Sequence, residues 1–188
     1  MIHALLKNEW AVVLDACVLV PMPLCDTLLR CAEDRALFRA LWSDETLNEV
    51  RRTLVKLGFS RAQAEHRVEE MHSTFPDACV PTPTALLDAV PKIPDPGDRH
   101  IVAAAIHERA HAIVTLNLRH FPQNFLEPLG ISVYSPDEFL VRLFHRSPDS
   151  IMGVLDRQAS AIGQQRFSML ERLKRGLPEF AALVEKGR

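Results

Sequence analysis

The stretch Ala11-Val-Val-Leu-Asp15 indicates a short buried strand that ends at a carboxylate. Four consecutive apolar residues, two of them valine, are too few for a helix and are typical of a strand covered on both faces. A carboxylate directly behind such a strand is costly unless something compensates its charge. Asp15 therefore either caps the next turn through its own side chain or belongs to a binding site, and this residue alone leaves both interpretations open.

Helical and extended patterns alternate along the rest of the chain. Two more apolar runs predict buried strands, at residues 112–115 and 130–134. Apolar spacing and helix caps predict helices at residues 24–32, 43–58, 60–75, 95–109 and 135–145, with a short helical or irregular piece at 84–89. Strands joined by helical crossovers form parallel sheets with helices on their faces. We therefore expect an α/β fold in which helices cover both faces of a parallel sheet.

The last part of the chain, from about Ser147, shows no strand pattern and is interpreted as two or three further helices. The predicted organisation is thus one domain over residues 1–145, followed by a C-terminal helical extension over residues 146–188. A chain of 188 residues is long enough to bury a sizeable core without stabilising disulfide bonds or metal ions.

Composition excludes several classes of protein. Hydrophobic residues make up 47% and charged residues 24%, which excludes a disordered chain, a collagen-like repeat and a coiled coil. The net charge of −2 provides no global basic field, so a nucleic-acid partner would have to be held locally. No apolar stretch reaches the roughly 20 residues that a membrane helix needs. Residues 1–9 lack the pattern of a signal peptide, and we expect a cytoplasmic protein without a membrane span.

The four cysteines, Cys17, Cys25, Cys31 and Cys79, form no C-x-x-C motif and have no histidine at zinc-finger spacing. They are interpreted as buried thiols of a reducing compartment rather than a metal or redox site.

Two further carboxylates could join Asp15, because ligand sites of parallel sheets lie beyond the carboxyl ends of the strands. Asp98 shares a helix face with the apolar residues that follow it, although a first-turn aspartate also suits the helix dipole. Asp95 is expected to be the cap of the same helix rather than a ligand. Glu49 flanks the apolar stripe of its helix, and taken alone it is better explained by a surface pair with Arg52.

Taken together, Asp15, Glu49 and Asp98 point to a metal. Three carboxylates at one sheet end repel one another unless a hard divalent cation neutralises them. Oxygen ligands without a cysteine–histidine cluster favour Mg²⁺ or Mn²⁺ over Zn²⁺. The chemistry natural to such a site is metal-assisted hydrolysis of a phosphodiester.

Four segments surround these residues in the order 12–19, 42–50, 94–100 and 114–122, and they read VVLDACVL, WSDETLNEV, PDPGDRH and VTLNLRHFP. This ordered set resembles the PIN-domain family, and within it the VapC-like toxins of bacterial toxin–antitoxin pairs. The resemblance covers about residues 10–145, and helices after the domain also occur in one branch of that family.

The resemblance implies a three-layer PIN-like fold and a divalent-metal-dependent endoribonuclease that cleaves single-stranded RNA. It implies an RNA substrate, a cognate antitoxin as partner, and a homodimer. Asp15, Glu49 and Asp98 match the three acidic metal-binding positions, and Asn117 matches the polar catalytic position nearby. His120 stands where such sites commonly have a fourth acidic residue. It could bind a metal as neutral imidazole, position a water, or leave a second metal position empty.

Other interpretations stay open at this point. His120 also motivates a degenerate PIN module that binds RNA or a protein partner without cleavage. A phosphotransfer receiver or phosphatase domain is weakly supported, because no D-x-D pattern follows the first strand. His100 could orient a carboxylate or lie on the helix surface. Five basic residues could meet phosphates or belong to a solvated face: Arg51, Arg52, Lys56, Arg99 and Arg119.

Overall fold

The strand predicted at Ala11–Leu14, β1, is the centre of the fold in the computed structural model, which describes residues 10–33, 37–90 and 92–187. The expectation for residues 1–9 lies outside this part of the chain. Five parallel strands form one sheet in the order β3-β2-β1-β4-β5. The other four are β2 (Arg39–Ser43), β3 (Cys79–Val80), β4 (Ala112–Val114) and β5 (Ser132–Tyr134).

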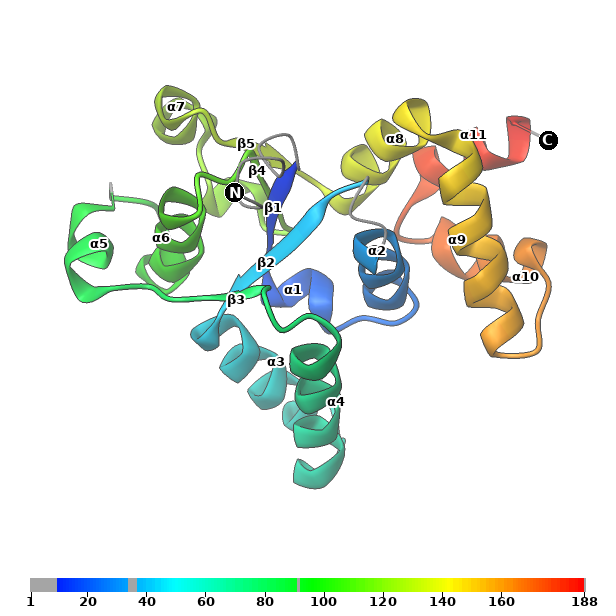
Figure 1. The fold of residues 1–188 in the computed structure, drawn as a ribbon, viewed down its shortest axis with the longest axis horizontal. Coiled ribbons are helices and arrows are strands. Elements are labelled where there is room, and N and C mark those ends of the chain that lie inside the picture. The colour runs from blue at the N-terminus through cyan, green and yellow to red at the C-terminus, as the bar shows by residue number, and fades with distance from the viewer. Residues whose placement is uncertain (1–9, 34–36, 91, 188) are drawn as a thin grey trace, which may run out of the picture.

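The predicted layers are confirmed, because alternate residues of the central strands enter two separate cores. Val13 belongs to the core beneath α6 (Arg99–His107), together with residues of α5 (Thr84–Ala89) and α7 (Gln123–Leu126). Val12 and Leu14 belong to the core on the other face, with α2 (Leu24–Glu33) and α8 (Pro136–Arg146). Figure 1 shows α5, α6 and α7 on one side of the sheet and α2 and α8 on the other.

The sequence did not predict β2 and β3. The sequence predicts a helix from residue 43, and α3 (Asp44–Lys56) does begin directly after Ser43, the last residue of β2. The preceding residues are a strand because Val13 pairs with Leu41 across the sheet. Such pairing joins residues far apart in the chain, so periodicity within the segment does not reveal it.

The predicted helix caps are confirmed. Ser43 accepts a hydrogen bond from the backbone N–H of Thr46 and begins α3. Complete capping boxes begin α4 (Arg61–Thr74) at Ser60 and α8 at Ser135. Asp95 caps as expected, but the element that follows is a short 3-10 turn, η1 (Pro96–Asp98), and α6 begins only after it.

Three helices follow α8, where the sequence predicts two or three: α9 (Pro148–Ala161), α10 (Arg166–Lys174) and α11 (Pro178–Lys186). Ile151, Leu155 and Phe180 belong to the same core as the sheet residues Val12 and Leu14. Among the helices of the described ranges, none is long and apolar enough to cross a bilayer.

Candidate active site at the carboxyl end of the sheet

The carboxyl ends of the strands open onto a cleft of about 570 Å³. α1 (Ala16–Leu19), α3 and η1 bring side chains to it from segments far apart in the sequence. The structure places four predicted site residues on its wall, and these are Asp15, Glu49, Asp98 and Asn117. This is the edge where parallel sheets hold their ligands.

Asp15 is only 3% exposed and is held by three donors. Its Oδ1 accepts from the backbone N–H of Cys17 at 3.3 Å. Its Oδ2 accepts from the hydroxyl of Thr115 at 2.6 Å and from the thiol of Cys17 at 3.0 Å. Asp15 therefore caps α1, as the first interpretation predicts, and it also lines the cleft, where its part in a binding site stays a prediction.

Cys17 and Thr115 are site residues that the sequence reasoning missed. Burial and the neighbouring Asp15 carboxylate raise the pKa of the Cys17 thiol to about 12, so the thiol keeps its proton and donates it. Thr115 in turn accepts from the backbone N–H of Asn117 at 2.9 Å, which links Asp15 to the loop after β4. The available signal was the Thr115-Leu-Asn117 pattern at the end of a predicted strand. Cys25 and Cys31 are buried as expected, whereas Cys17 and Cys79 are only half-buried.

Asp98 lies beside an imidazole and another carboxylate. His120 Nδ1 is 2.7 Å from Asp98 Oδ2 and 3.7 Å from Asp95 Oδ2. Burial raises the pKa of the Asp98 carboxyl, the Asp15 and Asp95 carboxylates raise it further, and the hydrogen bond from His120 opposes them. His120 thus joins the site through Asp98.

The sequence predicts that Asp95 is a cap rather than a ligand. In the structure its side chain caps the turn η1 and also lies close to Asp98 and His120. Its Oδ1 accepts from the backbone N–H of Gly97 at 2.9 Å, which is the capping role. It also lies in a group with Asp98 and His120 whose ligand atoms are all within 4.8 Å of one another. A 3-10 turn places residues i and i+3 on the same side, and this brings Asp95 and Asp98 together.

Glu49 faces His100 across the space between α3 and α6. His100 Nε2 is 3.5 Å from Glu49 Oε1, and Arg52 Nη2 is 4.0 Å from the same oxygen. Of the two positions considered for His100, the helix surface is wrong, because the residue is 5% exposed.

The five basic candidates have different environments. Arg52 and Lys56 line the cleft. Arg51 pairs with Glu65, and the guanidinium of Arg99 donates to backbone carbonyls in the last turn of α5 and directly after it, so both are engaged in the fold. Arg119 lies on the surface of the turn η2 (Leu118–His120).

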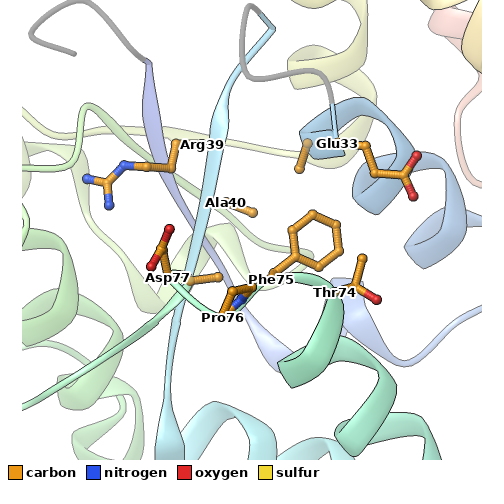
Figure 2. A pocket seen from close by; sticks show the side chains of 9 residues that line it. Glu33, Arg39, Ala40, Thr74, Phe75, Pro76 and Asp77 are labelled. Carbon is orange, nitrogen blue, oxygen red and sulfur yellow. The ribbon is translucent and has the colours of Figure 1, made fainter. Parts of the chain in front are cut away.

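A second hollow, of about 190 Å³, lies at the opposite edge of the sheet. Figure 2 shows Arg39 and Asp77 on one side of it and Glu33 and Phe75 on the other. Arg39 is the first residue of β2, so this hollow is at the amino end of the strands. Ligand sites of parallel sheets lie at the other end, and the carboxylate cleft is the better candidate.

The donor set of the cleft fits a divalent cation. The cleft wall itself offers the carboxylates of Asp15, Glu49 and Asp98. Asp98 also belongs to the close group with Asp95 and His120, and carboxylate oxygens with one imidazole nitrogen suit Mg²⁺ and Mn²⁺. Burial is the main cause of the raised pKa of Asp98, and repulsion from the Asp15 and Asp95 carboxylates adds to it. A bound divalent ion would remove that repulsion.

Comparison with known proteins shows what the sequence of this chain is similar to. The family model described as PIN domain matches residues 11–119. A protein of Mycobacterium tuberculosis named "Putative ribonuclease VapC50" is 39% identical over 92 residues, which are 47% of this chain and 54% of that protein. The match therefore spans about half the length of this curated relative. No solved structure matches the chain.

Proposed function

Because the chain belongs to the PIN-domain family, we propose that it is a metal-dependent endoribonuclease that cleaves single-stranded RNA. The observation that carries this proposal is the convergence of Asp15, Glu49 and Asp98 on one cleft. We further propose that it acts in the cytoplasm as the toxin of a toxin–antitoxin pair, with a cognate antitoxin and a homodimeric state. The likeness to a VapC relative supports these last points.

In this proposal Asp15, Glu49 and Asp98 hold Mg²⁺ or Mn²⁺. When bound, such an ion lowers the pKa of a water and neutralises charge on the phosphate. Thr115 and Cys17 keep the Asp15 carboxylate fixed by donating to its Oδ2. His120 keeps Asp98 in place through its Nδ1, while Asn117 offers an amide at the cleft wall for a phosphate or a water.

An RNA substrate is supported by Arg52 and Lys56, which stand one turn apart on α3 at the cleft wall. Arg52 is held by Glu45 at 2.6 Å. Lys56 makes no ion pair within the described ranges and is exposed. Phosphates on either side of the cleaved bond would meet these cations, and such contacts make binding depend on salt.

Replacing Lys56 with Ala is expected to weaken RNA binding without harming the chemistry. Loss of one exposed phosphate contact should raise KM for RNA about three- to tenfold and lower the salt slope of binding by about 1. Cleavage of a small diester with a single phosphate should be unchanged, because it does not reach Lys56. Steady-state kinetics on both substrates checks this.

The matched control is Lys186→Ala on α11, which lies far from α3 (Figure 1). It should leave KM for RNA unchanged. Equal effects of Lys56→Ala and Lys186→Ala would contradict a local role for Lys56.

Metal dependence is tested by cleavage of single-stranded RNA with Mn²⁺, Mg²⁺ or EDTA. We expect cleavage with either ion and none in EDTA, because the carboxylates alone provide no counter-charge for the phosphate. The variant His120→Asp restores a fourth carboxylate and should cleave at least as fast as the native protein. Gel analysis of end-labelled RNA measures both.

The same experiment addresses the second candidate function. His120, in place of a fourth carboxylate, favours a module that binds RNA or a protein without cutting. Cleavage that appears only in His120→Asp would support that candidate. Absence of cleavage from both proteins would contradict the nuclease proposal.

A further inference from the structure

His100 is buried beside Glu49, and the proposed function so far gives it no role. Its side chain leaves α6 at the second residue of that helix and enters the core between α3 and α6. His100 Nδ1 lies 2.7 Å from Ser43 Oγ, at the end of β2. His100 Nε2 is fully buried and has no hydrogen-bond partner, yet it lies 3.5 Å from Glu49 Oε1.

The hydrogen bonds around Ser43 indicate which nitrogen of His100 carries the proton. Ser43 Oγ accepts from the backbone N–H of Thr46 at 3.1 Å and lies 3.0 Å from Thr46 Oγ1. If Thr46 Oγ1 also donates to it, Ser43 uses its own proton to donate to His100 Nδ1. Ser43 Oγ, Thr46 Oγ1 and His100 Nδ1 then all have partners, and the neutral imidazole carries its proton on Nε2, which faces Glu49 Oε1.

The other tautomer is less favourable. A proton on Nδ1 would leave the Nε2 lone pair buried, without a donor, and facing a carboxylate oxygen. A buried polar atom without a partner costs about 1–3 kcal/mol. An Nε2–H group that faces Glu49 instead has an acceptor within a small movement of the carboxylate.

We propose that Ser43 and His100 form a positioning relay for Glu49. Ser43 donates to Nδ1 and fixes the imidazole, and the Nε2–H group donates to Glu49 Oε1. That bond leaves the second carboxylate oxygen, Oε2, for the cation. This inference rests on the proposed function, since it assigns Glu49 to the metal.

The contact of His100 with Glu49 is more rigid than the contact of Arg52 with the same carboxylate. Arg52 approaches Glu49 Oε1 only to 4.0 Å, and its side chain is 56% exposed. His100 is enclosed by the core, so its direction is set by packing and by Ser43. Groups that orient a ligand in this way are worth about 10- to 100-fold in metal affinity. His100 is thus a positioning residue.

Two variants distinguish the contact that Nε2 makes with Glu49 from the contact that Nδ1 makes with Ser43. In His100→Gln, the side-chain amide reaches the place of Nε2 and can still donate to Glu49. In His100→Asn, the shorter amide reaches only the place of Nδ1 and keeps the contact with Ser43. We expect the Kd for Mn²⁺ to rise about 10- to 100-fold in His100→Asn and to stay near the native value in His100→Gln.

The measurement is Mn²⁺ binding without RNA, by calorimetry or by the electron paramagnetic resonance of free Mn²⁺. Thermal unfolding of the metal-free variants shows whether a change in Mn²⁺ affinity only reflects a change in the stability of the fold. His145→Asn, at an exposed position of α8, is the control and should bind Mn²⁺ as the native protein does. In a Glu49→Gln background, His100→Asn should cause no further loss, since it acts through Glu49.

Equal Kd values in the native protein and in both variants would overturn the relay and leave the nuclease proposal intact. Losses that are equal in His100→Gln and His100→Asn and that follow their stability would also overturn it, in favour of a purely structural role. A native protein that binds no Mn²⁺ would overturn the relay together with the metal-dependent function.

Discussion

Asp98→Asn is expected to lower the rate of RNA cleavage about a thousandfold, which corresponds to about 4 kcal/mol of lost transition-state stabilisation. Asp98 lies between Asp15 and His120, so this change removes a ligand charge from the middle of the site. An amide keeps the shape and can still accept from His120 Nδ1. Single-turnover cleavage at saturating Mn²⁺ measures the chemical step.

Stability should not fall in this variant. Burial and the nearby carboxylates raise the pKa of Asp98 in the folded state, so the fold favours the neutral form. A carboxyl with a raised pKa destabilises the fold once the pH exceeds the ordinary pKa, because the proton must be lost in an unfavourable place. Neutral Asn at pH 7 therefore leaves the melting temperature equal to or above that of the native protein.

The control is Asp149→Asn, an exposed aspartate in the first turn of α9. It should leave cleavage unchanged. Native cleavage rates in Asp98→Asn would contradict the assignment of Asp98 to the site. A cleavage loss accompanied by unfolding would show a structural role instead.

Phe180→Ala is expected to destabilise the whole protein by about 3–5 kcal/mol, because truncation of a buried aromatic residue leaves a cavity. Phe180 is fully buried in α11 and shares a core with α8 and the sheet. Its backbone N–H donates to Asp137 Oδ1 at 2.8 Å, which ties α11 to the start of α8. Urea unfolding followed by circular dichroism measures the loss, and we expect one cooperative transition.

This prediction also bears on the organisation proposed from the sequence, with a domain at 1–145 and an extension at 146–188. The matched control is Phe167→Ala on α10, which is 52% exposed and should cost less than about 1 kcal/mol. Two separate transitions in Phe180→Ala would contradict a shared core and show that the extension unfolds independently.

The sequence predicted elements whose signals are local. The composition of residues 11–14 indicates a buried strand, and the capping boxes at Ser60 and Ser135 indicate where two helices begin. It did not predict β2 or β3, because a strand is defined by its partners, and the pairing of Leu41 with Val13 has no trace within either segment. The carboxylates at the ends of predicted strands and helices could also be predicted as site candidates, because those ends are recognised from local sequence.

The supporting residues of the site could not be found in this way. Thr115 stabilises Asp15 over a separation of 100 residues, and Ser43 meets His100 over 57. A short Thr or Ser side chain has the same local pattern whether it caps a helix or holds a catalytic group. Only the approach of distant segments decides between these roles.

The sequence by itself determined the class of the fold and the order of its motifs, and it predicted Asp15, Glu49 and Asp98 as candidates, because propensity, capping and periodicity act between near neighbours in the chain. The tertiary structure decided which charges meet. It brought Asp95 to His120, turned His100 inward to Glu49, and left Lys56 beside the cleft while Arg99 was drawn into the fold. Burial and electrostatic coupling depend on packing between segments distant in sequence, and no local pattern encodes them.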